Sequence, residues 1–600
     1  MRFIFFIPVL TALILWTGFR MSDTSSSTAG LHLRYNQIGY LPDDTKIALL
    51  FSEKPLSGSF RLVHPNGRSA FAARLVPEKR DPWVKFPYVY KLDFSTLRQP
   101  GEYRLRLRQE VPSPTPIRIG NELYRGTAED LLEFMRQQRC GYNPFLDVVC
   151  HRHDGRSFYG PMPDSTYLDV SGGWHDAGDQ LKYLITGSFA TASMLLAYEQ
   201  EPGKFEDRVN HLGQPGANGI PDVLDEARWG LEWIFKLHPA PDQLVHQVAD
   251  DRDHRGWKWP HEDISDYGWG PNSYRAAYFA NGKPQGLGQY KSQATGMANI
   301  AGRSAAAMAM AARIWREREL GEPAFASQCL QAAESLYAMG REYEGYQQGN
   351  SYGAPYRYNE DTWADDMEWA AAELYATTGK SHYLDEARRF ARIIGPHSML
   401  NEDTAAHYQL YPFLNIGHFR LHQVADTPLR DELATYYRES IEKCMRRGDG
   451  NAYGAGVPFI WCSNNVVVAL ITQIILYELM TGDLQYRDFM TAQRDWLFGC
   501  NPWGSTMFTM MPRDGEYPVD VHTSLWMMTK TEVPGGLVDG PLWRTVHAKQ
   551  LGITLTREDV FAAFQNDYVV YHDDVGDYAT NEPTMDGTAS AIYMMAWLSR

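Results

Sequence analysis

The stretch GGWHDAGD at residues 172–179 places two carboxylates, Asp176 and Asp179, three residues apart on a glycine-rich turn with aromatic neighbours. A second acidic segment, Asp573–Asp586, lies near the far end of the chain and contains Glu582. Acid/base hydrolysis of a glycosidic bond requires two such groups that the fold brings together. The two segments therefore indicate a hydrolytic site, and the other regions are interpreted against that hypothesis.

Between these segments the chain is mainly helical. Apolar residues recur at helical spacing, as in Leu224, Ala227 and Leu231, and some stretches, such as 301–312, are apolar on more than one face. We expect helices over residues 131–139, 180–200, 221–237, 294–315, 324–343, 363–378, 383–393, 428–443, 466–480, 486–498 and 588–598. Many paired helices without a fixed repeat favour an α/α toroid over a TPR or HEAT array.

Residues 31–120 have a different pattern. Turn sequences such as Pro65-Asn66-Gly67 separate short runs rich in β-branched and aromatic residues, at 31–35, 46–52, 60–63, 88–93 and 103–107. This spacing predicts a small β-sandwich. Because it contains no cluster of catalytic residue types, we expect a structural or docking role for it, and a catalytic domain over residues 121–600.

Composition limits the class of partner. The formal net charge of −16 over 600 residues argues against nucleic acid or an anionic membrane surface as partner. The chain has 17 Trp, 35 Tyr and 26 Phe, which fit either a large aromatic core or a cleft with flat platforms for sugars. Composition alone does not separate these two readings.

The N-terminal residues resemble a targeting segment. Residues 1–19 carry one Arg followed by an apolar run, which is typical of a secretory signal peptide. No clear cleavage site follows, so an uncleaved anchor is the alternative. We assign residues 1–21 to a signal peptide or N-terminal anchor and 22–30 to a flexible Ser/Thr-rich tether. We therefore expect an exported protein, whether periplasmic, cell-surface or extracellular.

The paired carboxylates fit an inverting mechanism. A helix N-cap would explain Asp179 alone but not the whole turn. In an inverting hydrolysis one carboxylate deprotonates water, and a carboxylic acid about 6.5–9.5 Å away protonates the leaving oxygen. Glu582 is the candidate acid, and a surface Glu that caps the final helix is the alternative. The acids and aromatics of residues 571–578 favour a site, where burial beside negative charge would raise the pKa of Glu582.

Three motifs together resemble the signatures of family 9 glycoside hydrolases, the inverting cellulase family. They are GGWHDAGD, NPWG at 501–504, and the pattern Y-x-D-x4-Y-x3-E that runs from Tyr571 to Glu582. Residues 31–120 resemble the immunoglobulin-like module that precedes many of its catalytic domains. The resemblance implies an (α/α)6 barrel that cleaves β-1,4-linked glucan, of cellulose or a related plant polysaccharide, with inversion. It implies these roles: Asp179 as general base, Asp176 as its helper, Glu582 as general acid, and Asp573 as the signature aspartate beside the site.

Two positions depart from the family pattern. The family has His-x-Arg after NPWG, whereas this chain has His522-Thr523-Ser524, and Thr588 stands where many family endoglucanases have Asn. His522 can still contact sugar hydroxyls. Both changes fall in the expected substrate-contact region, so an exo-acting β-glucosidase or β-glucosaminidase on short oligosaccharides is an alternative. From other classes, a non-catalytic carbohydrate-binding protein would need no paired carboxylates, and a zinc hydrolase would need an open metal position.

Two cysteines and two histidines are candidates for a metal site. Cys140, Cys150, His151 and His175 form a Cys2His2 set that suits a structural zinc ion. From spacing alone, a Cys140–Cys150 disulfide or free thiols are the alternatives. The resemblance favours zinc, since several family members with the immunoglobulin-like module hold zinc there. Because His175 adjoins Asp176, the metal would fix the catalytic turn.

Three aspartates offer a second, calcium-type set of ligands. Asp361, Asp365 and Asp366 lie at the start of an expected helix, and oxygen-rich clusters suit calcium. Family 9 domains often carry calcium near such a helix. The alternative, which the residues themselves favour, is a solvated acidic helix start that the helix dipole stabilises.

The loop around residue 260 concentrates aromatic residues. Trp257, Trp259, Tyr267 and Trp269 occur among glycines and prolines, where they can stack on sugar rings or pack against the barrel rim. We expect no organic cofactor, a β-glucan polysaccharide or oligosaccharide as partner, and a monomer. The candidate substrate-binding residues are His522, Trp257, Trp259 and Tyr578.

Overall fold

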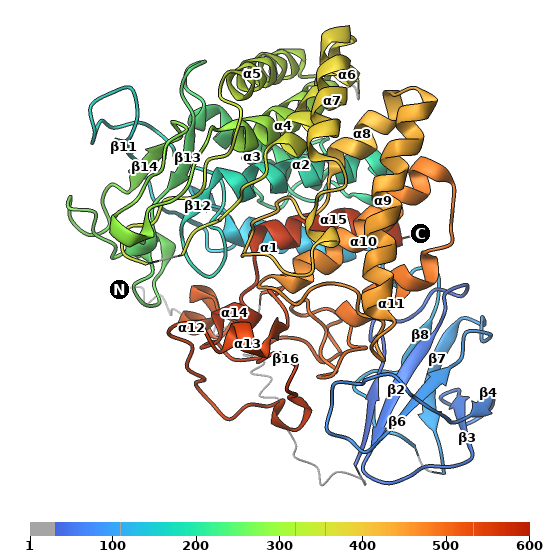
Figure 1. Ribbon diagram of the computed structural model, residues 1–600. Coiled ribbons are helices and arrows are strands. Elements are labelled where there is room, and N and C mark those ends of the chain that lie inside the picture. The colour runs from blue at the N-terminus through green and yellow to red at the C-terminus, as the bar shows by residue number, and fades with distance from the viewer. Residues whose placement is uncertain (1–29, 109, 318–319, 355, 532, 600) are drawn as a thin grey trace, which may run out of the picture.

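The computed structural model describes residues 30–108, 110–317, 320–354, 356–531 and 533–599. The predicted leader at residues 1–21 and the tether up to residue 29 lie outside that range. Figure 1 shows two parts, a β-sandwich in blue and a larger helical domain, with the sandwich beside helix α11.

The sandwich consists of two four-stranded sheets, with the strand orders β1-β2-β6-β5 and β4-β3-β7-β8. In β7, Tyr103 and Leu105 are buried while Glu102 and Arg104 are exposed, which is the alternation of a strand with one face on a core. The sandwich is confirmed, but β4, β5 and β8 were not predicted. The strands are β1 Leu31–Arg34, β2 Ile47–Ser52, β3 Ser59–Val63, β4 Ser69–Arg74, β5 Val76–Pro77, β6 Tyr88–Asp93, β7 Gly101–Arg106 and β8 Ile117–Ile119.

Six helices of the described chain form an inner ring. Each packs against the next, in the order α2, α4, α6, α8, α10 and α15, and α15 closes the ring on α2. Nearly every residue of α2, α10 and α15 is buried, as expected for helices covered on all sides. The inner helices are α2 Leu184–Gln200, α4 Ala298–Glu317, α6 Ala364–Thr378, α8 Ile416–Val424, α10 Ser463–Thr481 and α15 Met585–Leu598.

A second set of helices lies outside this ring and confirms the mainly α, (α/α)6 architecture. These helices bury one stripe, as α7 does with Tyr383, Ala387 and Phe390. In the described residues only α10 is long and apolar enough to cross a membrane, and 83% of its most apolar window is buried inside the barrel. The outer helices are α1 Thr127–Gln138, α3 Asp222–Leu237, α5 Pro323–Glu342, α7 Ser381–Ile394, α9 Thr427–Gly448 and α11 Arg487–Leu497.

Two features of the helical domain were not predicted. Helix α8 is short and mostly buried, so its sequence lacks the contrast between a polar and an apolar face. The second feature is a set of short strands in the helical domain, for which the sequence shows no convincing series. A four-stranded sheet, in the order β11-β14-β13-β12, is built from segments of two to four residues in the long loops. Its strands are β11 Arg156–Phe158, β12 Lys182–Tyr183, β13 Val245–Val248 and β14 Ala276–Phe279.

The sandwich docks on the last turn of α11 and on the segment that follows it. Asn36 Nδ2 donates to Asp495 Oδ1 at 2.7 Å, and Arg34 Nε donates to the carbonyl oxygen of Pro502 at 2.8 Å. Gly504 has φ +72°, a backbone conformation that favours glycine, and a Cβ atom there would lie 2.6 Å from Arg34 Nη1. The NPWG motif therefore joins the two domains and does not line the candidate catalytic pocket.

Candidate active site

A pocket of about 290 Å³ lies where segments preceding five inner helices meet. Residues just before α2, α6, α8, α10 and α15 all contribute to it, so the N-terminal ends of these helices face it. Helix N-termini favour negative charge, which suits a site rich in carboxylates. The lining residues are Asp176, Ala177, Asp179, Tyr183, His254, Tyr356, Arg357, Tyr358, Asn359, His407, Trp461, Cys462, His522, Asp539, Tyr578, Glu582 and Thr584.

The 172–179 turn has its shape because bulky neighbours approach its backbone. Gly173 has φ +70°, and a Cβ atom there would lie 2.5 Å from the Trp233 ring. A Cβ atom on Gly178 would lie 2.1 Å from the carbonyl oxygen of His522. Larger residues therefore cannot occupy these positions without moving the turn. The glycines let the turn touch the opposite wall of the pocket, which carries His522 and Glu582.

Asp176 is buried and held on both oxygens. Its Oδ1 accepts from Thr186 Oγ1 at 2.7 Å, and its Oδ2 accepts from the Tyr358 hydroxyl. Burial and then the charge of Asp179 raise the pKa of Asp176 well above its usual value. Its backbone carbonyl accepts from the amide of Met585, the first residue of α15, at 2.9 Å. Asp176 thus connects the turn to the segment that carries Glu582.

Asp179 has an environment that favours its charged form. Its Oδ1 accepts from the Leu181 amide at 2.8 Å, and His254 Nε2 lies 3.4 Å from its Oδ2. Burial acts to raise the pKa of Asp179, but the hydrogen bond and charge of His254 outweigh it, and the pKa is lowered. Helix α2 begins only at Leu184, with Tyr183 as its N-cap, so Asp179 is not an N-cap residue.

Glu582 lies directly opposite the turn. Its Oε1 accepts from the Gly178 amide at 2.9 Å, and His522 Nε2 is 4.0 Å from the same oxygen. Burial and then the charge of Asp179 raise the pKa of Glu582 well above its usual value. Two adjacent carboxyl groups therefore have pKa values shifted in opposite directions, which is the arrangement that separates a base from an acid.

A short helix, α14 (Tyr578–Asn581), positions Glu582 at its C-terminal end. Asp577 caps this helix through the Ala579 amide and also accepts from His547 Nε2 at 2.9 Å and His572 Nδ1 at 2.6 Å. Asp577 has a pKa below its usual value because the hydrogen bonds and charges of both histidines outweigh burial. Glu582 is thus supported by a network of side chains on its own side of the pocket.

Asp573, expected beside the site, does not itself line the pocket. Its Oδ1 accepts from the amides of Val519 and Asp520, at 3.0 and 2.8 Å, and from Asn581 Nδ2 at 3.3 Å. Burial raises the pKa of Asp573 to about 6. These contacts tie the segment before His522 to α14, so Asp573 supports the acid side from behind.

Three of the expected substrate-contact residues lie together: His522 and Tyr578 line the pocket, and Trp257 packs against His522. His522 Nδ1 donates to the Val575 carbonyl oxygen at 2.6 Å, which orients the ring. Trp257 packs edge-on against His522, with ring centroids 4.7 Å apart. Tyr578 lines the pocket and donates its hydroxyl to the Leu551 carbonyl oxygen at 2.9 Å.

The remaining aromatics of the 257–269 loop pack elsewhere. Trp259 packs against the small cluster of Phe134, Leu525 and Val533, and borders a second, smaller cavity on the other side of Asp179. Tyr267 is buried and donates to Asp253 Oδ2 at 2.8 Å, and Trp269 packs against Phe158. The sequence did not separate these packing roles from Trp257, because all four share one loop composition.

Several pocket residues were missed at the sequence level. His254, Tyr356, Tyr358, His407, Trp461 and Asp539 line the pocket, yet none belongs to a recognised motif. Asp539 is buried and accepts from Trp461 Nε1 at 2.7 Å and from Cys462 Sγ at 3.1 Å. The available signal was that His254 and the two tyrosines fall in the long loops at 239–292 and 344–361. Loops of such length in a compact domain are usually functional.

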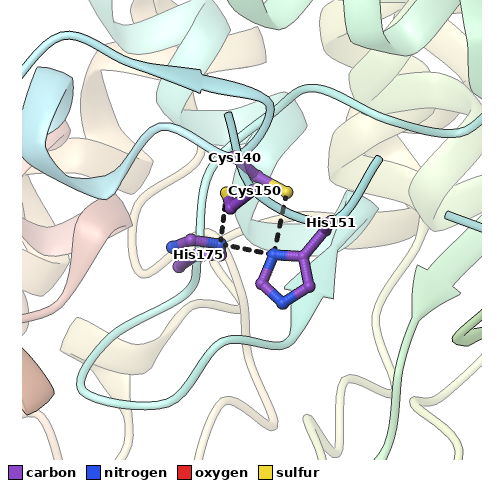
Figure 2. Close-up of side chains that lie close together, drawn as sticks. All are labelled: Cys140, Cys150, His151 and His175. Carbon is purple, nitrogen blue, oxygen red and sulfur yellow. Dashed lines mark hydrogen bonds between the residues drawn. The ribbon is translucent and has the colours of Figure 1, made fainter. Parts of the chain in front are cut away.

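Cys140, Cys150, His151 and His175 converge on one buried point (Figure 2). Their ligand atoms lie within 4.8 Å of one another, with His175 Nε2 and His151 Nδ1 3.2 Å apart. Both cysteines are free thiols, so the disulfide alternative is not adopted. His151 Nε2 also lies 3.1 Å from Asp263 Oδ2, which is the carboxylate partner that metal-bound histidines commonly have. The set fits a metal ion.

Two of the three aspartates of the expected calcium site, Asp361 and Asp366, pair with protein groups. Asp366 pairs with Arg303 at 2.8 Å, and Asp361 Oδ2 accepts from Gln409 Nε2 at 2.8 Å. Asp365 is buried, and burial raises its pKa to about 7. The described groups of side chains close enough to share a metal ion do not include these three. The structure gives the calcium expectation no support.

Comparison with known protein families divides the chain as the fold does. The profile of glycosyl hydrolase family 9 matches residues 124–595, and that of the cellulase N-terminal ig-like domain matches residues 28–111. Endoglucanase C of Cellulomonas fimi is 25% identical over 617 residues, which cover 95% of this chain and 52% of that protein. The chain thus spans about half the length of this relative.

Solved structures agree with this division. The crystal structure of a metagenome-derived glycoside hydrolase family 9 endoglucanase aligns with a TM-score of 0.74 at 26% identity, over 95% of this chain and 99% of that one. A Zn-binding triple mutant of the family 9 endoglucanase J30 aligns with a TM-score of 0.74 at 25% identity, over 93% and 99% of the two chains.

Proposed function

The chain belongs to glycosyl hydrolase family 9, and from that membership we propose that it hydrolyses β-1,4-linked glucan with inversion at the anomeric carbon. One observation carries the proposal. A carboxylate with a lowered pKa, Asp179, and a carboxyl group with a raised pKa, Glu582, line the same pocket. This pair supports Asp179 as the general base and Glu582 as the general acid.

The proposed reaction consumes one water molecule. Asp179 accepts a proton from water as the water oxygen forms a bond to C1 of the sugar. Glu582 donates its proton to the glycosidic oxygen as the bond between C1 and that oxygen breaks, and the bonding electron pair leaves on the oxygen. The products are a sugar of inverted anomeric configuration and a chain with a new hydroxyl group. Asp176, which Tyr358 and Thr186 hold, helps to position the water.

We assign the Cys140, Cys150, His151 and His175 set to a structural zinc ion. Two thiolates and two imidazoles are the ligand set of closed tetrahedral zinc sites, which leave no open position for chemistry. The zinc would stabilise the fold near the base. Because His175 precedes Asp176 directly, the four ligands fix the backbone of the catalytic turn.

We also propose that the protein is exported and acts as a monomer. A polymeric glucan does not enter cells, so its hydrolysis requires an enzyme outside the cytoplasm. The predicted leader at residues 1–21 fits this location. His522, Trp257 and Tyr578 are the proposed sugar contacts.

The test compares wild type with Glu582→Gln on soluble β-1,4-glucan, xyloglucan and chitosan oligomers. We expect wild type to release reducing sugar from at least one β-1,4-linked substrate, and Glu582→Gln to release none above background while it keeps its fold and sugar binding. Sugar binding without cleavage by wild type would instead support the carbohydrate-binding alternative.

A further inference from the structure

We infer that the catalytic pocket is closed on the side that receives the glycone, so that the protein removes units from the non-reducing end of its substrate. This inference rests on the proposed hydrolysis of β-1,4-linked glycan and adds the mode of attack. It follows from a ring of side-chain contacts around the pocket, which we call the pocket ring. In order, its members are Asp179, His254, Tyr356, Tyr578, Trp461, His407, Tyr358 and Asp176.

The first half of the pocket ring runs from the base to Tyr578. His254 Nε2 lies 3.4 Å from Asp179 Oδ2, and the His254 ring packs edge-on against Tyr356 at 6.0 Å. The hydroxyl groups of Tyr356 and Tyr578 are 3.4 Å apart. These residues come from three separate loops, so the fold has brought them together across the pocket.

The second half of the pocket ring returns to the base side. Tyr578 packs against Trp461 at 5.5 Å, and Trp461 stacks on His407 at 4.3 Å. His407 contacts the Tyr358 ring at 5.6 Å, and the Tyr358 hydroxyl donates to Asp176. The 176–179 turn then joins the two ends. Every member of the pocket ring also lines the pocket.

Hydrogen bonds fix the loops that carry the pocket ring. The Leu551 carbonyl oxygen accepts from the hydroxyls of Tyr578 and Tyr356, at 2.9 and 3.4 Å. The Asp251 carboxylate accepts from the amides of Tyr352 and Gly353. The segment before Tyr356 is therefore hydrogen-bonded to the loop that carries His254. Tyr356 itself is hydrogen-bonded to the loop at Leu551. The part of the pocket wall formed by Tyr356 is therefore held by hydrogen bonds on both sides.

The general acid marks the direction in which the leaving chain departs. Glu582 and His522 line the pocket but stand outside the pocket ring, and Trp257 packs on His522. Because Glu582 protonates the leaving oxygen, the leaving chain passes this side. The cleaved unit then occupies the ringed side of the pocket. The whole pocket has a volume of about 290 Å³, which is at the small end of ligand pockets.

An enzyme that cuts within a chain needs a groove that is open on both sides of the reacting bond. The pocket ring removes that opening on the glycone side, so a long chain can enter only by its end. The loss of the family's arginine after His522 concerns the other side, where the leaving chain lies. The mode of attack therefore follows from the loops and not from the signature motifs.

The test uses two cello-oligosaccharides that differ only by a benzylidene acetal on the 4- and 6-hydroxyls of the non-reducing end. We expect wild type to cleave the uncapped substrate, with cleavage of the capped one at background. Equal cleavage of both would overturn the inference while leaving the proposed function intact. No cleavage of either would remove the proposed function and the inference with it.

Variants of Tyr356 test the wall itself. Tyr356→Ala removes one side of the pocket ring, so we expect it to gain cleavage of the capped substrate and a larger fall in glucan viscosity per bond cut. Tyr356→Phe keeps the aromatic ring and serves as the matched control, with the wild-type preference retained. A folded Tyr356→Ala protein that still rejects the capped substrate would overturn the role of the pocket ring.

Discussion

The two sides of the catalytic pocket are held in place by different means. The base side, residues 172–186, depends on close backbone packing at Gly173 and Gly178 and on the buried Cys2His2 set behind it. The acid side, residues 573–584, depends on carboxylates that accept hydrogen bonds, with Asp573 and Asp577 as its main anchors. Close packing and the Cys2His2 set hold the turn that carries Asp179, whereas hydrogen bonds to carboxylates hold the segment that carries Glu582.

This difference shows how one pocket keeps two nearby carboxyl groups in different protonation states. His254 supplies positive charge next to Asp179, whereas Glu582 accepts from the amide of Gly178 and faces further carboxylates. Its other neighbour, His522, lies 4.0 Å away and has a pKa that burial lowers. The histidines of the acid side, His547 and His572, are paired with Asp577 instead of Glu582. The acid therefore keeps its proton and the base keeps its charge.

The largest expected effect distinguishes the proposed general base, Asp179, from the proposed general acid, Glu582. Asp179→Asn and Glu582→Gln should each lower kcat on unactivated glycan by about 10²–10⁴-fold, the usual contribution of a general base or acid. On an aryl glycoside whose leaving group needs no proton, Glu582→Gln should recover most of its activity and Asp179→Asn should not. Rates of both variants on both substrates provide the measurement. Recovery by Asp179→Asn instead would reverse the assignment of the two roles.

The next largest effect tests whether the proposed metal site supports the turn that carries Asp176 and Asp179. Cys140→Ser should lose bound zinc, lower Tm and reduce kcat by roughly 10–100-fold, because the turn that carries Asp176 loses its support. Metal content, Tm and kcat are measured together. The matched control is Cys329→Ser, since Cys329 is a buried thiol far in sequence from the four proposed ligands, and it should keep its zinc. A Cys140→Ser protein with full zinc content would contradict the assignment.

The smallest effect concerns the pH profile. His254 lowers the pKa of Asp179, so His254→Ala should raise that pKa and move the acidic limb of kcat/KM to higher pH by about one unit. The alkaline limb, which follows Glu582, should move less. His547→Ala is the control on the acid side and should leave the acidic limb in place. A shift of that limb to lower pH would contradict the account.

The sequence predicted most of the helical barrel because its helices carry clear periodic patterns. It did not predict α8, which is short and mostly buried, or β4, whose alanine-rich sequence has weak strand propensity. The short strands β11 to β14 were missed because two to four residues carry no readable alternation. Their pairing depends on contacts between loops far apart in the chain.

The same limit applies to the site. Asp176, Asp179, Glu582, His522 and the Cys2His2 set lie in motifs and were found from the sequence. Five other members of the pocket ring were not found, because their place depends on the way in which separate loops meet: His254, Tyr356, Tyr358, His407 and Trp461. Asp573 belongs to a signature but supports the backbone from behind, so a motif position alone did not reveal its distance from the pocket.

The measurement that tests the central claim most directly is the anomeric configuration of the first product. Wild type is mixed with a cello-oligosaccharide, and proton NMR follows the new reducing end before mutarotation equilibrates it. A single displacement by water, with Asp179 as base and Glu582 as acid, predicts that the α-anomer appears first and the β-anomer later. A β-anomer that appears first would mean retention and would contradict the account.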